Sequence, residues 1–201
     1  MSEPAAVPLP TAAAGQFPDA LLCTQAFPEA VPAPCLIETA LSWVILAGDC
    51  AYKIKKPLHN DFIDASSVER RLFLCTEELR LNQRYSHGLY LDVVQIGCDE
   101  TGIGFGRGRT AIDYAVRMRQ FDPAMELTRA LNERRVTTEE MGQFGTALAR
   151  LHRGAPSAIP DASYGTAATL EEQIFANFAP LRGNPRFEKL LNAPTGGAPI
   201  A

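Results

Sequence analysis

The chain has 201 residues, of which 46% are hydrophobic and 21% are charged, so it can bury a core as one ordinary domain or two small ones. A formal net charge of −4, with no basic stripe along the sequence, argues against nucleic acid as a partner. No apolar run reaches the length of a membrane span, and no secretory signal stands at the N-terminus, so we expect a cytoplasmic protein without a membrane partner.

Apolar periodicity and turn residues predict a mixed α+β chain. Residues 1–17 are rich in Ala and Pro and are expected to form a disordered arm, whereas residues 192–201 lack periodicity and are expected to form a loose tail. Between them the patterns predict, in order, a short helix over 18–27, strands over 36–46 and 51–56, a loop over 58–65 packed by Phe62 and Ile63, a helix over 66–85, strands over 89–96 and 111–121, and helices over 123–134, 137–154 and 171–181.

The second strand of the first hairpin carries two lysines. Gly48-Asp49 is a turn pair between two short apolar runs, so residues 51–56 are expected to return antiparallel to the strand before them. Residues two apart in a strand point to the same face, which puts Lys53 and Lys55 together. Lysines on one face of a half-buried strand need an anionic partner, either a helix carboxylate or a bound phosphate. The other interpretation is the solvated edge of an ordinary hairpin.

The helix over 66–85 supplies a candidate carboxylate. Ser66 and Glu69 have the spacing of a capping box at its start. Glu78 falls on the same helical stripe as three apolar residues, and a carboxylate there is costly unless it is paired. Glu77, one position round the helix, is the second choice, and a Glu78 at the edge of the stripe that reaches water is the alternative. The apolar stripe consists of Leu74, Leu81 and Tyr85.

Two further motifs bear on function. The alternate glycines at 102, 104, 106 and 108 suggest a phosphate loop, but a strand follows them where a nucleotide fingerprint needs a helix, so we expect a hairpin. Thr137 and Glu140 form a second capping box, ahead of a stripe of four apolar residues beside which His152 has a structural role. That stripe consists of Met141, Phe144, Leu148 and Leu151.

The cysteines and histidines do not group. The five cysteines lie far apart without a CxxC pair, and their odd number in a chain of this size argues against a disulfide framework. We expect them to be reduced and mostly buried, as small apolar residues. The three histidines are scattered, so a zinc site has little support.

The order of hairpin, lysine strand, capped helix, two strands and further helices resembles a protein-kinase-like small lobe and the beginning of its large lobe. The segments SWVILAGDCAYKIKKPL, VERRLFLCTEELRLNQR, LYLDVVQI and DYAVRMRQFD resemble the amino-terminal half of a bacterial family. Its members join an aminoglycoside-phosphotransferase-like domain to an AAA-type P-loop ATP-binding domain. The resemblance covers roughly residues 17–182, and YKIKKP and EELRLN are its most specific parts. It implies a kinase-like N-lobe over 18–121 and a partial helical C-lobe over 122–191.

The resemblance also implies roles for particular residues. In such kinases a strand lysine contacts the phosphates of ATP and a helix glutamate fixes its position. Lys53 corresponds to that lysine and Glu78 to its partner, with Lys55 as the alternative lysine on the same face. A hinge whose backbone would hold the adenine corresponds to Met118, Arg119, Gln120 and Phe121. ATP and Mg²⁺ are the implied cofactors, and phosphoryl transfer to a small-molecule hydroxyl is the implied reaction.

No catalytic residue of such a kinase is present in this sequence. The catalytic-loop aspartate and the later metal-binding aspartate have no counterpart, because no Asp follows Asp161 and no His follows His152. We therefore expect a kinase domain truncated before its catalytic loop, inactive as a lone chain. Its expected partners are nucleotide and a missing C-terminal half or P-loop ATPase domain. The alternative is a non-catalytic protein-interaction module in which the Lys–Glu pair is structural.

Overall fold

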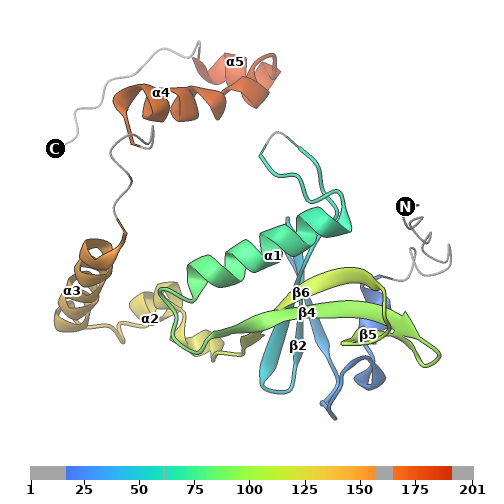
Figure 1. Cartoon of the computed structure of the whole chain (residues 1–201). Coiled ribbons are helices and arrows are strands. Elements are labelled where there is room, and N and C mark those ends of the chain that lie inside the picture. Colours follow the sequence, from blue (N-terminus) through green and yellow to red (C-terminus); the bar gives the residue numbers. More distant parts are fainter. Residues whose placement is uncertain (1–16, 61, 157–164, 192–201) are drawn as a thin grey trace. The chain divides into compact units, whose positions relative to one another are not determined.

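The computed structural model describes residues 17–60, 62–156 and 165–191, and within them the predicted α+β class is confirmed. The expected arm, apart from Phe17, and the expected tail lie outside these residues. The chain divides into two compact units, residues 1–146 and 147–201. The first unit contains an antiparallel six-stranded sheet of order β1-β2-β3-β6-β4-β5, with helix α1 packed on β6 and β4 (Figure 1).

The strands and helices have the following bounds. The strands are β1 (Cys35–Glu38), β2 (Ser42–Ala47), β3 (Cys50–Lys55), β4 (Tyr90–Asp99), β5 (Gly102–Phe105) and β6 (Ala111–Arg119). The α-helices are α1 (Val68–Asn82), α2 (Leu127–Asn132), α3 (Thr138–Gly154), α4 (Ala167–Ala176) and α5 (Pro185–Leu191). Short 3₁₀ turns are η1 (Asp19–Leu21), η2 (Thr24–Ala26), η3 (Pro123–Met125) and η4 (Ala179–Leu181).

The hairpin turn at Gly48-Asp49 is confirmed. Ala47 pairs with Cys50 across a two-residue loop, and Gly48 adopts φ +57°, which suits a residue without a side chain. The single strand predicted over 36–46 is wrong, since it is two strands. The Thr39 amide donates to the Ser42 carbonyl at 2.9 Å and turns the chain back on itself between β1 and β2.

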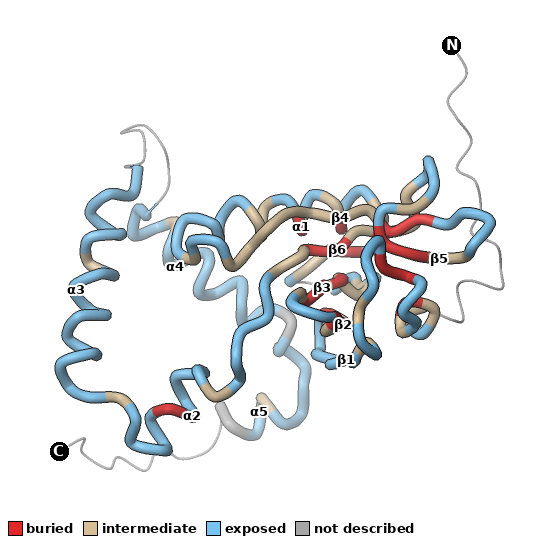
Figure 2. The backbone as a smooth tube through the Cα atoms, turned by 90° about the horizontal axis from the view of Figure 1, so that it is seen from below, coloured by how far each residue is buried: buried red, intermediate tan, exposed pale blue. Residues whose placement is uncertain are grey.

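One face of the sheet is covered by the segment before β1. Leu21 and Phe27 from this segment pack with Tyr52, Ile54 and Phe105 in the buried core, which Figure 2 shows in red along the strands. The ring centroids of Tyr52 and Phe105 lie 4.3 Å apart. The helix predicted over 18–27 is wrong, because Cys23 is extended and separates two 3₁₀ turns.

Helix α1 differs from the prediction in its first residue and in the side that it turns to the sheet. Its N-cap is Ser67, whose hydroxyl accepts from the Arg70 amide, whereas Ser66 bonds to Asp64. Its buried residues are Arg71 and Cys75, and the predicted stripe is wrong, since Leu81 and Tyr85 are 43% and 55% exposed. Glu78, three residues after Cys75, therefore lies on the sheet-facing side for a different reason from the predicted one.

The glycine-rich segment forms a hairpin, as predicted, but it contains a strand that was not predicted. β5 pairs with β4 from Asp99–Gly102 to Ile96–Phe105, so four residues expected to lie in the turn of this hairpin form a strand of their own. The chain after β5 folds back so closely that a Cβ on Gly97 would lie 1.9 Å from the Arg107 carbonyl oxygen. Close backbone approach thus accounts for glycine at this position.

The chain after β6 is helical in shorter pieces than predicted. The helix expected over 123–134 is η3 followed by α2, and the helix expected over 171–181 begins earlier, at Ala167 after the Thr166 cap, and ends at Ala176. The Thr137–Glu140 capping box is confirmed, with reciprocal bonds of 2.8 and 3.2 Å. Helix α5, which was not predicted, begins at Pro185, a residue suited to the first helical position.

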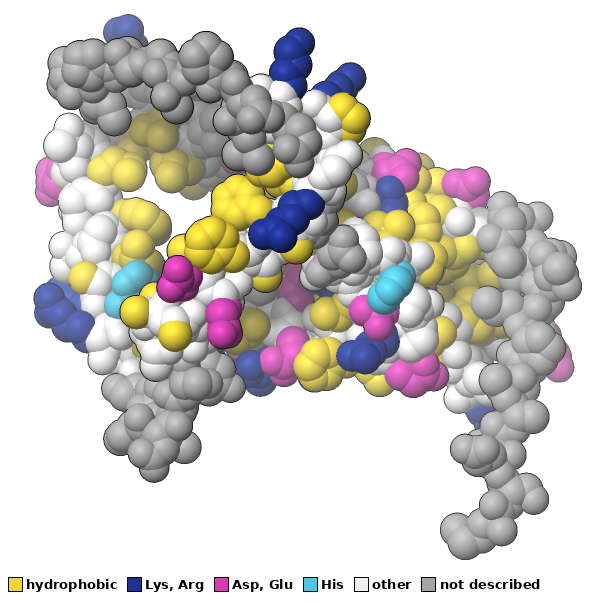
Figure 3. Space-filling model, turned by 90° about the horizontal axis from the view of Figure 1, so that it is seen from above, with side chains coloured by type: hydrophobic (Ala, Val, Ile, Leu, Met, Phe, Trp, Pro, Cys, Tyr) yellow, Lys and Arg dark blue, Asp and Glu magenta, His cyan; other side chains and the backbone are white. Residues whose placement is uncertain are grey.

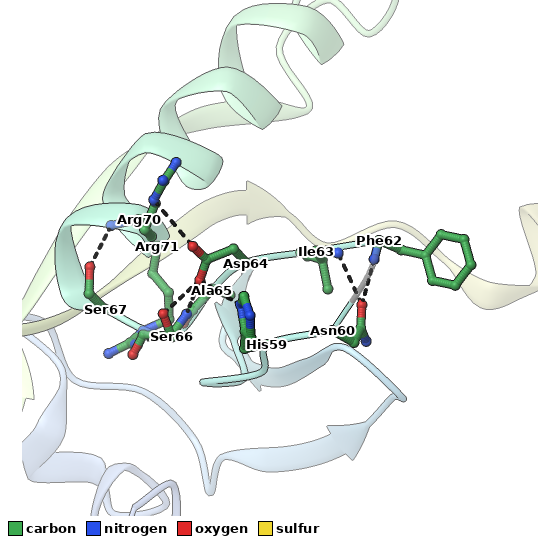
Figure 4. Close-up of polar contacts among 10 residues, drawn as sticks. All are labelled: His59, Asn60, Phe62, Ile63, Asp64, Ala65, Ser66, Ser67, Arg70 and Arg71. Carbon is green, nitrogen blue, oxygen red and sulfur yellow. Dashed lines mark hydrogen bonds and ion pairs between the residues drawn. The ribbon is translucent and has the colours of Figure 1, made fainter. Parts of the chain in front are cut away.

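Two expectations about burial are wrong. Phe62 is 66% exposed, because the Asn60 side chain accepts from the Phe62 and Ile63 amides and turns the loop tip outward (Figure 4). All five cysteines are free, but Cys75 alone is fully buried, whereas Cys23, Cys35 and Cys98 are exposed. None of the helices in the described ranges is long and apolar enough to cross a membrane.

Candidate functional site

Two lysines on β3 meet one glutamate on α1. β3 lies between β2 and β6, where Lys53 is paired with Val44 and Val116, and Lys55 with Ser42. Because side chains alternate along a strand, both lysines point to the face on which α1 packs. The opposite face carries the apolar core.

The contacts are short and use both carboxylate oxygens. Lys53 Nζ lies 2.8 Å from Glu78 Oε1, and Lys55 Nζ lies 2.6 Å from Glu78 Oε2. The side chains of Lys55 and Glu78 are 12% and 13% exposed, whereas that of Lys53 is 32% exposed. The more accessible lysine is therefore Lys53, and Lys55 is the more enclosed member of the group.

The charges at this site do not balance. Burial acts to raise the pKa of Glu78, but its hydrogen bonds to Lys53 and Lys55 and their charges outweigh burial, so the pKa lies below the usual value. Burial raises the pKa of the nearby Cys75 thiol to about 11, and burial also raises the pKa of Tyr90, so both are neutral at pH 7. Two ammonium groups and one carboxylate leave one net positive charge.

A buried ion pair fixes the beginning of α1 to the sheet. Arg71 Nε donates to Asp113 Oδ1 at 2.8 Å, and Arg71 Nη1 donates to the carbonyls of Ala65 and Ser66. Arg71 and Asp113 are 6% and 5% exposed. Further along, Cys75 Sγ lies 3.9 Å from the Tyr114 carbonyl. These contacts hold the helix against β6 and so set where Glu78 meets the lysines.

Sequence reasoning missed the Arg71–Asp113 pair. Asp113 falls on the polar positions of the alternating strand over 111–121, so the pattern did not indicate that it is buried and needs a cation. The second-choice glutamate, Glu77, does not meet the lysines, since it binds Arg80 on its own helix at 2.6 Å.

The loop between β3 and α1 is organised by Asp64. Its Oδ1 accepts from the Ser66 hydroxyl at 2.6 Å and lies 3.4 Å from His59 Nδ1, while Oδ2 lies 3.4 Å from Arg70 Nε (Figure 4). The Ser66 hydroxyl and amide, followed by His59 and Arg70, lower the pKa of Asp64 to about 2. The loop that joins the lysine strand to the glutamate helix is therefore tied to the start of that helix.

The predicted hinge lies at the end of the β3–β6 ladder. Met118 is half-buried, and Phe121 is 64% exposed. The amides of Arg119 and Gln120 are used, since they donate to the carbonyls of Leu89 and Asp49 at 2.8 Å. The Phe121 amide makes no hydrogen bond with any described residue.

The structure does not bring the hinge into contact with the lysines. Lys53 is paired with Val116, and Arg119 stands three residues further along β6. At about 3.3 Å per residue, these positions are roughly 10 Å apart. Among the described ranges, no group of three or more His, Cys, Asp or Glu side chains could hold a metal ion.

Comparison with known proteins gives distant relatives. No family model matches the chain, and no solved structure matches it. Over 145 residues the chain is 27% identical to an uncharacterized protein of Mycobacterium bovis and to uncharacterized proteins of two Mycobacterium tuberculosis strains. The match covers 72% of this chain but 28% of each relative, so the chain spans well under a third of the length of these relatives.

Proposed function

We propose that residues 18–121 are a kinase-like small lobe that binds the phosphates of ATP through Lys53, with Glu78 and Lys55 as its positioning partners. The observation that carries the proposal is the shared carboxylate: Glu78 of α1 holds both β3 lysines at 2.8 and 2.6 Å. In protein kinases a strand lysine and a helix glutamate form this kind of pair.

The charge imbalance favours an anion. Once Glu78 has neutralised one ammonium group, the other remains without a counter-charge, and a phosphate oxygen can supply one through a charge-assisted hydrogen bond. Lys53 is the better phosphate ligand because its side chain is 32% exposed, against 12% for Lys55. Lys55 keeps the carboxylate in place when Lys53 turns toward the ligand.

The hinge supplies a place for the base of the nucleotide. Of the four predicted residues, Met118, Arg119 and Gln120 are tied into the sheet or the β2–β3 turn, which leaves the Phe121 amide to donate to an adenine. Phe121 stands five residues beyond Val116, the partner of Lys53, which is at most about 17 Å of chain at about 3.3 Å per residue. ATP, whose base and phosphates lie at opposite ends of a ribose, would have to span this separation.

The resemblance to aminoglycoside-phosphotransferase-like domains extends the proposal to a reaction class, transfer of the ATP γ-phosphoryl group to a small-molecule hydroxyl. The sequence contains no catalytic-loop aspartate to accept the hydroxyl proton, so the activity proposed for this chain is nucleotide binding. Mg²⁺ would add charge neutralisation on the phosphates when bound, but the proposal assigns it no ligand among the described residues.

Isothermal titration of the purified chain with ATP, with and without Mg²⁺, tests the proposal. Lys53→Ala should weaken ATP binding about tenfold to a hundredfold, the value of one charged hydrogen bond. Lys56→Ala is the matched control, because Lys56 pairs with Glu38 at 2.6 Å and stands next to the same strand on its other face. Equal ATP affinity of Lys53→Ala and Lys56→Ala would show that the assigned site is wrong.

A non-catalytic interaction module is the second candidate, and exposed apolar residues favour it. The α3 stripe is open, with Phe144 57% and Met141 38% exposed, and Figure 3 shows hydrophobic side chains reaching the surface on the face drawn. Patches of this kind mark protein-binding sites. In this case ATP should have no effect, and Phe144→Ser should abolish association with a partner protein without changing the sheet.

A further inference from the structure

We propose that a second site, beside the start of α1 and lined by neither lysine, binds a small neutral ring compound that carries an amide. The site is a cavity of about 510 Å³ between the start of α1 and strands β2, β5 and β6. Its lining includes Phe17, Trp43, Ile103, Ile112, Arg71 and Asp113. The volume lies within the range of small-molecule sites in proteins.

The walls are apolar and suit a ring. Phe17 and Trp43 meet edge to face, with ring centroids 5.5 Å apart and planes at 76°. Ile103 and Ile112 are partly buried and pack against the core. These four side chains are already held in position, so an aromatic ring of a ligand packed against them would be buried from water.

The polar end of the cavity is a buried ion pair with unused atoms. Arg71 bonds through Nε and Nη1, and Asp113 accepts through Oδ1 from Arg71 and from the Tyr114 amide. Arg71 Nη2 and Asp113 Oδ2 make no hydrogen bond with any described residue, and both residues line the cavity. No buried side-chain nitrogen or oxygen in the described ranges lacks a partner, so these two atoms are open to water although the residues are mostly buried. The site therefore presents one donor and one acceptor that a ligand can satisfy.

This pair selects an amide over an acid. The charges of Arg71 and Asp113 balance each other, and Glu69 at the rim adds a negative charge beside the first turn of α1. Glu69 is hydrogen-bonded to its own amide and to Ser67, which lowers its pKa and occupies the helix terminus that an anion would use. An amide offers its carbonyl to Arg71 Nη2 and its N–H to Asp113 Oδ2 without adding charge.

The cavity is separate from the lysine site. Trp43 pairs with Ile54 across β2 and β3, and Ile54 pairs with Ala115, two residues after Asp113. Because side chains alternate, Trp43 and Ile54 lie on the opposite face from Lys53 and Lys55, and neither lysine lines the cavity. The inference therefore does not require the proposed function, although Arg71 and Asp113 also hold the helix that carries Glu78.

NMR of the whole chain with benzamide as the probe tests the inference, since the indole N–H of Trp43, the single tryptophan, reports from the cavity wall. Benzamide should shift this signal saturably. Toluene lacks the amide, benzoate adds a charge, and N,N-dimethylbenzamide lacks the N–H. Each should bind at least about tenfold more weakly than benzamide, as expected for one lost buried hydrogen bond.

Two variants complete the test. Ile103→Phe should fill the cavity and abolish the benzamide shift while leaving the ion pair intact, and Ile37→Phe, the same change at a position 47% exposed on β1, should not. Lys53→Ala should leave benzamide binding unchanged. The inference is overturned if benzamide causes no saturable shift, if toluene or benzoate binds as tightly, or if Ile103→Phe binds benzamide like the wild type.

Discussion

Glu78 is the residue on which two elements depend, because its one carboxylate serves two lysines from a neighbouring strand. Removing it leaves Lys55, which is 12% exposed, without a counter-charge in a place that water hardly reaches. Glu78 contributes to stability mainly because it keeps an enclosed lysine paired, and less because either contact is strong by itself.

We predict that Glu78→Ala lowers the free energy of unfolding by about 2–4 kcal/mol, near the lower end of the range for breaking a buried pair. The neighbouring Glu77→Ala should cost much less, because its pair with Arg80 is exposed and local. Urea unfolding of the two variants makes the comparison, and similar losses would mean that the lysine contacts carry no special stability.

Asp64 gives a prediction for acid pH. Its pKa is lowered from 3.8 to about 2, chiefly by the Ser66 hydroxyl and amide. A carboxyl with a depressed pKa in the folded state stabilises the fold above its unfolded pKa, and this contribution is lost as pH falls from about 3.8 toward 2. A carbon-detected NMR titration should place the Asp64 midpoint near 2, and Ser66→Ala should raise it. A midpoint near 3.8 in the wild type would contradict the loop geometry.

At the scale of elements, the sequence predicted correctly those turns and caps that depend on residues close together in the chain. The Gly48-Asp49 turn and the Thr137–Glu140 box are set by residues close in sequence, and both are found in the structure. The face of α1 was predicted wrongly because apolar spacing favoured Leu74 and Leu81, whereas the sheet offers Asp113 as a partner for Arg71. That preference depends on tertiary contacts, which periodicity does not contain.

β5 was missed for a similar reason. Its sequence, GIGF, has too few side chains to show alternation, and its pairing with β4 is made by the backbone. The lysine–glutamate contact could be predicted because a partly buried charge without a partner is unfavourable. Two strand lysines and one inward carboxylate have few other partners within reach. The Arg71–Asp113 pair had no such pattern.

Close packing between backbone segments predicts the effect of a glycine substitution. Gly97→Ala would place a methyl group 1.9 Å from the Arg107 carbonyl oxygen, so the turn after β5 must move. We expect a loss of at least about 1–3 kcal/mol in the free energy of unfolding. Gly142→Ala in α3, where an added Cβ meets nothing within 4 Å, should instead stabilise the helix by about 0.5–1 kcal/mol. Thermal unfolding that ranks Gly97→Ala level with the wild type would contradict the observed approach.

At the scale of the whole molecule, the buried core lies between the sheet and the segment before β1, and both proposed sites use residues of the sheet and α1. The helices after β6 carry large apolar residues at the surface, among them Phe144, Ile174 and Phe175, each more than half exposed. The mycobacterial relatives are more than three times as long as the segment matched. We propose nucleotide binding for the sheet and keep the exposed helices as the candidate surface for a protein partner.

The most direct measurement of the central claim is an assigned ¹H–¹⁵N NMR titration of the chain with ATP. The account predicts that amide shifts concentrate at residues 53–55, at Glu78 and at residues 118–121, and that they are strongly reduced in Lys53→Ala. Shifts centred on the glycine-rich residues 102–110 instead, or no shifts at all, would contradict the assignment of the lysine pair to nucleotide phosphates.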